Sequence, residues 1–236
     1  MHARMIAPVG LSLFALTAGL VVTASASSQE KPAAGKPAQG KGDQGKGDKG
    51  KPAASPAPQA NVRRASGGYG IDPVHSTVLF KVKHANTSYA FGRFDNVSGT
   101  FTLLPDNMER SMINITVDAA SIDTNEKKRD AHLKSNAFFD VEQFPDATFV
   151  SRSIKKSGDT KYTAEGNLEI HGVRKPLTIE LEETGAIDHE KMGVLAGFFG
   201  QFTVKRSDFG MQFMPDMLGD EVQVTVSIEG RQTDAK

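Results

Sequence analysis

Residues 69–231 alternate apolar and polar side chains, and this period of two constrains the fold more than any other feature. Val78, Phe80 and Val82 share one phase, for example, while polar residues fill most of the other. Successive side chains of a β-strand point to opposite faces, so such segments predict strands with one buried face. About eight strands follow one another, joined mostly by short turns. An antiparallel sheet of this kind closes into a barrel or folds into a sandwich.

The chain contains no cysteine. Its stability must therefore come from a hydrophobic core rather than from disulfides. The absence also excludes thiol catalysis and cysteine-based metal sites. A lipid anchor at a cleavage-site cysteine is excluded as well, so we do not expect a lipoprotein.

Residues 1–26 are typical of a secretory signal peptide. Arg4 supplies the basic start, residues 6–22 form an apolar run, and Ala-Ser-Ala at 24–26 matches a cleavage site. An uncleaved membrane anchor is the alternative. A run of about 17 residues that contains Pro8 and Gly10 is short for a spanning helix, however, so cleavage is favoured. We expect a periplasmic or secreted protein.

Residues 27–68 are rich in Lys, Gly, Pro and Ala and contain almost nothing to bury, which predicts a disordered linker. This segment has eight basic and three acidic residues, and residues 69–236 have 19 basic and 25 acidic ones. The linker is either a plain spacer or a weak tether to an anionic envelope surface. The negative charge of the remainder argues against nucleic acid as a partner. Residues 232–236 form a short tail.

Residues 126–140 interrupt the alternation with a cluster of charged residues and predict one short connecting helix. Asp123, Thr124 and Asn125 are good N-cap residue types, and Asp123 with Glu126 has the spacing of a capping box.

Five blocks of the sequence, in this order, resemble the YceI-like family. They are DPVHSTVLFKVKH (72–84), FGRFDNVSGTF (91–101), KKRDAHLKSNAFFDVEQFPDATF (127–149), GNLEIHGVRKPLTI (166–179) and KRSDFGM (205–211). The resemblance covers all of residues 69–231. It implies an all-β fold, an eight-stranded antiparallel lipocalin-like barrel with one short connecting helix and an elongated apolar cavity. It also implies an exported protein that binds a polyisoprenoid or similar long-chain lipid, without known catalytic residues.

Two groups of residues are candidates for contact with such a ligand. Four polar residues are candidates for the head group: His84, Arg129, Asp130 and His132. Each has a structural alternative, as a strand-end histidine or as part of a charged helix surface, and we favour that alternative for Arg129 and Asp130. The residues expected to line an apolar cavity are Val78, Phe80, Val82, Phe101, Ile115, Val117, Phe149, Leu168, Ile179, Leu181, Phe198, Phe202, Val224 and Val226.

The sequence shows no nucleophile elbow, phosphate loop or dinucleotide fingerprint, and we expect neither an enzyme nor a cofactor. No two histidines have the spacing of a metal pair, so we expect no metal site. A lipid-binding protein is favoured over an envelope structural or adhesive protein and over a lipid-modifying enzyme. The oligomeric state stays open, with a dimer as one alternative.

Overall fold

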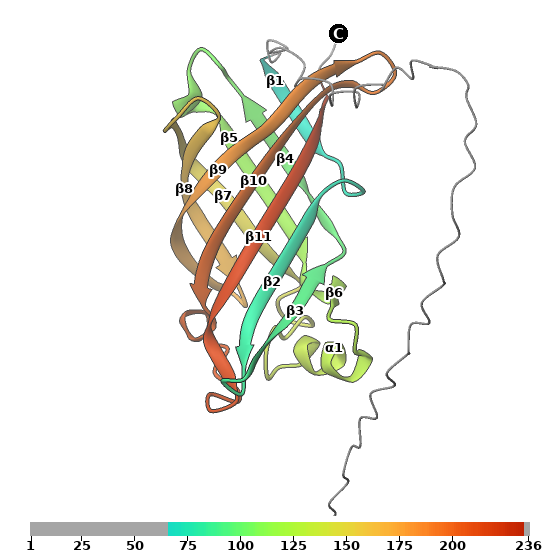
Figure 1. Ribbon diagram of the computed structural model, residues 1–236, viewed down its shortest axis with the longest axis vertical. Coiled ribbons are helices and arrows are strands. Elements are labelled where there is room, and N and C mark those ends of the chain that lie inside the picture. Colours follow the sequence, from blue (N-terminus) through green and yellow to red (C-terminus); the bar gives the residue numbers. More distant parts are fainter. Residues whose placement is uncertain (1–65, 234–236) are drawn as a thin grey trace, which may run out of the picture. The chain divides into compact units, whose positions relative to one another are not determined.

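The computed structural model describes residues 66–233, in which eleven strand segments form one antiparallel sheet (Figure 1). The segments are β1 Gly67–Ile71, β2 Thr77–His84, β3 Ser88–Phe94, β4 Val97–Leu103, β5 Met112–Asp118, β6 Ile122–Asp123, β7 Asp146–Lys156, β8 Lys161–Ile170, β9 Val173–His189, β10 Gly193–Lys205 and β11 Leu218–Gln232. β1 begins two residues before the domain boundary expected from composition. The predicted signal peptide, nearly all of the predicted linker and residues 234–236 lie outside the described residues.

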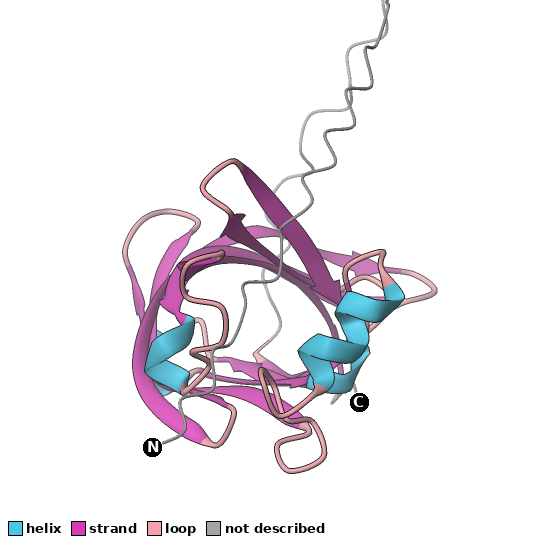
Figure 2. Ribbon diagram, turned by 90° about the horizontal axis from the view of Figure 1, so that it is seen from below, coloured by secondary structure: helices cyan, strands magenta, loops and turns pink. Residues whose placement is uncertain are grey.

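The eleven segments build a closed barrel of eight strands, because three of these strands are interrupted. β11 pairs with β1 near one end and with β2 along the rest, so β1 and β2 occupy one position in the wall. β3 pairs with β2 and β4 pairs with β1, so β3 and β4 share the next position. β6 pairs with β3 and β5 pairs with β4, so β5 and β6 share the position after that. The β1–β11 pairing closes the sheet, which Figure 2 shows encircling the barrel axis. This confirms the predicted eight-stranded barrel and excludes the sandwich.

The interruptions follow from local sequence and are held by backbone hydrogen bonds. Pro73 lies in the turn between β1 and β2, where a residue without an N–H group cannot extend a central strand. The breaks between β3 and β4 and between β5 and β6 lie side by side. There Asp95 N donates to Ser121 O at 3.1 Å, and Asp118 N donates to Asn96 O at 3.1 Å.

The predicted helix is α1, Lys127–Lys134, which lies beside β3 and β6 at one end of the barrel (Figure 1). Its N-cap is Glu126, whose carboxylate accepts from Lys128 N and Arg129 N. The expected cap within residues 123–125 was wrong, because Asn125 adopts a positive φ of 62° in a turn before the helix. Three 3₁₀ segments complete the described elements: η1 Met108–Arg110, η2 Ala119–Ser121 and η3 Arg206–Phe209.

Aromatic rings fill the barrel interior at the end remote from α1. Tyr69 stacks on Phe101 with ring centroids 4.8 Å apart, and Phe101 meets Phe198 edge-on at 5.6 Å. Tyr162 meets Phe198 from the other side at 6.1 Å. Ala164 is fully buried in the same core. This end of the barrel is therefore a packed core that closes the interior.

Candidate functional site

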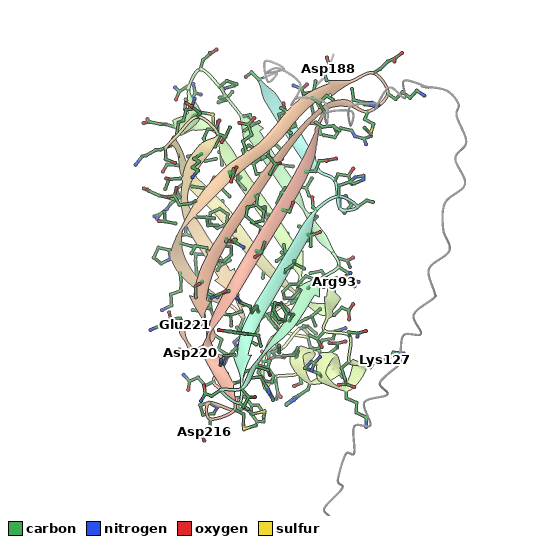
Figure 3. All side chains as sticks on the ribbon, viewed as in Figure 1. Arg93, Lys127, Asp188, Asp216, Asp220 and Glu221 are labelled. Carbon is green, nitrogen blue, oxygen red and sulfur yellow. The ribbon has the colours of Figure 1, made fainter. Side chains whose placement is uncertain are left out.

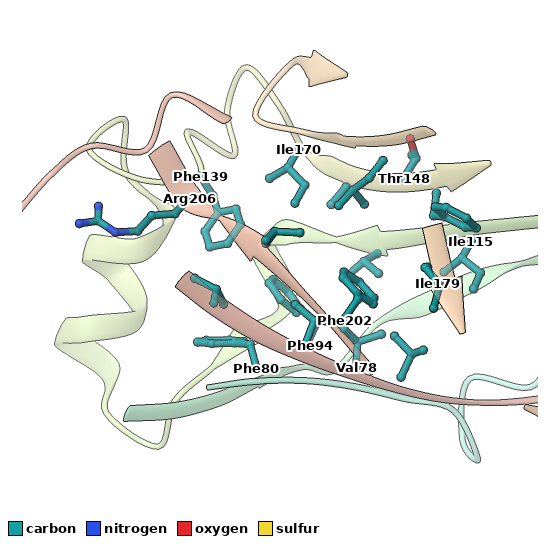
Figure 4. Close-up of a pocket in the computed structure, with 18 of the residues that line it drawn as sticks. Val78, Phe80, Phe94, Ile115, Phe139, Thr148, Ile170, Ile179, Phe202 and Arg206 are labelled. Carbon is teal, nitrogen blue, oxygen red and sulfur yellow. The ribbon is translucent and has the colours of Figure 1, made fainter. Parts of the chain in front are cut away.

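The other part of the barrel interior is an apolar cavity of about 180 Å³ (Figure 4). All the apolar residues predicted from the sequence lie in its wall. They are Val78, Phe80, Val82, Phe101, Ile115, Val117, Phe149, Leu168, Ile179, Leu181, Phe198, Phe202, Val224 and Val226. Strand register explains this placement, since Val224 of β11 lies opposite both Phe80 of β2 and Phe202 of β10. Residues in register on neighbouring strands point to the same face, so the inward rows form one continuous apolar wall.

The last turn of α1 and the segment that follows it close part of the wall at this end. Leu133, Phe138 and Phe139 line the cavity there, and Phe139 meets Phe94 of β3 edge-on at 5.7 Å. The sequence analysis did not assign these residues to the cavity. The signal that could have identified them is the Phe pair directly after the charged helix, because two adjacent large apolar residues require burial.

His132 lies at the edge of this region, on the exposed side of α1. Its ring packs edge-on against Phe138 and against Phe213, each with ring centroids 5.1 Å apart. Phe138 lines the cavity, whereas Phe213 is 45% exposed on the loop between η3 and β11. His132 is therefore one aromatic ring away from the cavity and remains a candidate for contact with a head group.

Arg129 and Asp130 hold the turn that leads into α1. Arg129 donates through Nε to Thr124 Oγ1 and through Nη2 to the Thr124 carbonyl oxygen, both at 2.7 Å. The Asp130 carboxylate accepts from the backbone N and the hydroxyl of the same threonine. Neither residue lines the cavity. Both charged side chains are thus hydrogen-bonded to Thr124. This agrees with the structural role, rather than contact with a head group, that the sequence analysis favours for them.

His84 ends β2 at the hairpin with β3, where its carbonyl oxygen accepts from Thr87 N at 3.0 Å. Its side chain is exposed and does not line the cavity, although it pairs in register with Leu218, which does. His84 follows Val82 by two residues and so has the same phase, but the strand ends there and its side chain lies beyond the edge of the cavity wall.

Arg206, which the sequence analysis did not select, is the one charged residue among the described residues that line the cavity. It lies at the start of η3, is 5% exposed, and donates to four backbone carbonyl groups. These are Met211 at 2.8 Å, Phe213 at 2.7 Å, Leu218 at 3.0 Å and Gly219 at 3.0 Å.

The environment of Arg206 changes the proton affinity of its guanidinium. Burial lowers the pKa of Arg206, while the negative charge of nearby Asp220 acts in the opposite direction. An arginine remains protonated at neutral pH despite such a change, because its ordinary pKa lies far above neutral pH. The sequence signal that could have identified Arg206 as a lining residue lies in the KRSDFGM block, where Arg206 directly follows a long apolar strand.

Comparison with known proteins places this architecture in a family. A model of the YceI-like domain matches residues 69–230. The chain belongs to the YceI-like family. Protein YceI of Salmonella newport (strain SL254) and that of Salmonella arizonae are both 38% identical to it over 158 residues. Each alignment covers 67% of this chain and 82% of the relative.

Solved structures share the YceI-like barrel. The crystal structure of Burkholderia cenocepacia BcnA has a TM-score of 0.62 at 25% identity, covering 67% of this chain and 98% of BcnA. A polyisoprenoid binding domain from Saccharophagus degradans, implicated in plant cell wall breakdown, has a TM-score of 0.55 at 14% identity. That alignment covers 70% of this chain and 98% of the domain, and at this identity it shows the fold alone. In residues 66–233 the YceI-like chain has no helix with the length and apolar character needed to span a bilayer.

Proposed function

We propose that this YceI-like barrel binds the hydrocarbon chain of a polyisoprenoid or a similar long-chain amphiphile. The observation that carries the proposal is the cavity wall, in which all the strands except β1 and β6 contribute apolar side chains. Burial of apolar surface contributes about 25 cal/mol per Å² removed from water, and such a wall offers little else to a ligand. The description of the Saccharophagus degradans domain as polyisoprenoid binding is consistent with this ligand class.

The ligand enters tail first, towards the packed aromatic end. Tyr69, Phe101 and Phe198 close the interior there, so a head group has no water-accessible position beyond them. At the opposite end the wall includes Arg206, and His132 lies next to the lining residue Phe138. Polar groups where an apolar cavity meets water orient an amphiphile. The head group therefore lies near α1 and η3.

The same proposal covers the biological setting. A signal peptide at residues 1–26 exports the protein to the periplasm or beyond, where it carries or stores the lipid as a binding protein rather than an enzyme. Residues 27–68 then serve as a spacer or as a weak contact to an anionic envelope surface. These assignments depend on the composition of the sequence, because the signal peptide and residues 27–65 lie outside the described residues.

Native mass spectrometry of protein purified from its own envelope, followed by lipid extraction, tests the proposal. We expect a complex with one long-chain lipid that dissociates only when the protein unfolds or the lipid is extracted. A protein that carries no lipid, and that takes up none from isoprenoid-containing micelles, contradicts it. Chemical turnover of the added lipid indicates the enzyme alternative. Binding to envelope polymer that disappears on deletion of residues 27–66 indicates the adhesive alternative.

A further inference from the structure

Three potential metal ligands converge on the outside of the barrel, at the interruption between β1 and β2. Asp72 and His75 belong to the loop that joins these strands (Figure 1), and Glu229 lies on β11. His75 Nδ1 lies 3.2 Å from Asp72 Oδ2 and 3.7 Å from Glu229 Oε1. One ligand atom from each residue lies within 4.8 Å of the other two. The cluster is separate from the cavity, whose lining includes none of these residues.

The backbone around the cluster is fixed on both sides. Asp72 N donates to Glu229 O at 2.9 Å, and the hydroxyl of Ser76 both donates to Glu229 O and accepts from Glu229 N. Asp72 Oδ1 accepts from Val74 N at 2.9 Å, which leaves Oδ2 directed towards His75. The loop and β11 therefore hold the ligands together without any ion, so little ordering is required when one binds.

The two distances from His75 Nδ1 are close to those between neighbouring ligand atoms of a bound metal ion. Metal bonds of about 2.0–2.2 Å to nitrogen and carboxylate oxygen, at tetrahedral or right angles, separate neighbouring ligand atoms by about 3.0–3.6 Å. The separations of 3.2 Å and 3.7 Å from His75 Nδ1 fall in or next to this range. Without an ion, His75 Nδ1 and the Asp72 carboxylate share a hydrogen bond. A metal ion bound here takes the place of the proton in that hydrogen bond.

We propose that Asp72, His75 and Glu229 form a binding site for a divalent transition-metal ion. One imidazole nitrogen and two carboxylate oxygens suit Zn²⁺ or Mn²⁺, and water completes the coordination, since His75 is 59% exposed. The ion links the loop between β1 and β2 to β11, next to the β1–β11 pairing that closes the barrel. It takes no part in lipid binding. The proposal therefore does not depend on the proposed lipid function.

Arg231 provides an internal check on the proposal. Its Nη2 lies 3.9 Å from Asp72 Oδ2, and its side chain is 52% exposed. A cation at this distance opposes a second cation at the same carboxylate. Replacing Arg231 with Gln should therefore strengthen metal binding. If the three residues served only as an ion-pair cluster around His75, Arg231→Gln would leave the metal affinity unchanged.

The experiment is a calorimetric titration of untagged, chelator-treated full-length protein with Zn²⁺ at neutral pH. We expect one equivalent to bind with a micromolar dissociation constant. His75→Ala and Glu229→Gln should each weaken binding by at least about tenfold. His189→Ala, a histidine elsewhere on the barrel, is the matched control and should leave the affinity unchanged. Zn²⁺ should raise the thermal midpoint of the unmodified protein but not that of Glu229→Gln.

Nuclear magnetic resonance with Mn²⁺ locates the ion directly. Paramagnetic broadening should be strongest at residues 72–76 and 228–231, and should be lost in the isosteric Glu229→Gln variant. The proposal is wrong if Zn²⁺ binds more weakly than about 1 mM. It is also wrong if His75→Ala and Glu229→Gln, both folded by circular dichroism, bind as tightly as the unmodified protein. Broadening centred on other carboxylates overturns it as well.

Discussion

The guanidinium of Arg206 lies 2.8 Å from the carbonyl oxygen of Met211, five residues further along the chain. Together with its bonds to three more carbonyl groups, this contact holds the loop between η3 and β11 against the end of the barrel. Met211 in this loop and Leu218 at the start of β11 both line the cavity. The position of the lining residues at this end therefore depends on a single buried cation.

Arg206→Met should destabilise the protein by about 2–4 kcal/mol, because it leaves buried carbonyl groups without donors. Arg206→Lys should recover only part of this loss, since an ammonium group has three donors and no planar fork. Urea unfolding measures both variants. Arg174→Met is the control, because the exposed Arg174–Glu169 pair should contribute less than about 1 kcal/mol. Equal stability of Arg206→Met and Arg174→Met would show that the four hydrogen bonds do not hold the loop.

The two parts of the barrel interior should respond differently to added volume. Val226→Phe places atoms in the cavity, opposite Gly200 of β10, and should reduce lipid uptake with little loss of stability. Ala164→Leu places atoms in a site that is 0% exposed and does not line the cavity, so overpacking should cost about 1–3 kcal/mol. Lipid stoichiometry and urea unfolding are measured on both variants. A large loss of stability in Val226→Phe, with unchanged lipid uptake, would show that the interior is filled.

His132 should distinguish between head groups if they lie near α1. His132→Phe keeps a ring against Phe138 and Phe213 but removes the imidazole nitrogens. A charge-assisted hydrogen bond contributes about 1.5–3 kcal/mol, so a phosphate-headed isoprenoid should bind roughly ten- to a hundredfold more weakly. The matched alcohol-headed isoprenoid should be much less affected.

His84→Ala is the comparison for this titration, because His84 lies outside the cavity wall. We expect it to bind both ligands like the unmodified protein. Equal losses for both ligands in His132→Phe would assign His132 to packing alone.

Stability should fall in acid partly through Asp220. Burial by itself would raise the pKa of Asp220, but hydrogen bonds from Ser207 N and Oγ, at 2.9 Å and 2.8 Å, and the charges of Arg206 and Lys205 lower it overall. A carboxyl group with a lowered pKa in the folded state stabilises the protein above its unfolded pKa, and this contribution is lost as the pH falls below about 4.

Asp220→Asn removes this titration and should make the free energy of unfolding less dependent on pH between about pH 5 and 2. Chemical unfolding over that range measures the slope. Asp216→Asn, in the loop before β11 (Figure 3), removes a carboxylate without touching the hydrogen bonds from Ser207 and is the matched control. An unchanged slope in Asp220→Asn would show that the hydrogen bonds from Ser207 do not favour the charged carboxylate.

The period-two pattern determined which side chains point inward, because the two faces of a strand are set by local geometry alone. Val78, Phe80 and Val82 therefore occupy the interior as expected, and the interrupted alternation at residues 126–140 corresponds to α1. The N-cap, Glu126, lies one residue after the last of the expected caps, Asn125. The turn at Asn125 depends on contacts of Thr124 with Arg129 and Asp130, which residue preferences do not include.

Only the tertiary structure decided which part of the interior is filled and which polar residues meet. Ala164 and Ile179 both occupy inward positions of the alternating pattern. Ala164 nevertheless lies in the packed core, while Ile179 lines the cavity. The difference arises from rings on separate strands, such as Phe101 and Phe198, whose meeting depends on barrel register. Asp72 and Glu229 approach each other for the same reason, although they are far apart in the sequence. Periodicity fixes the direction of a side chain, but contact between distant strands is fixed by closure of the sheet.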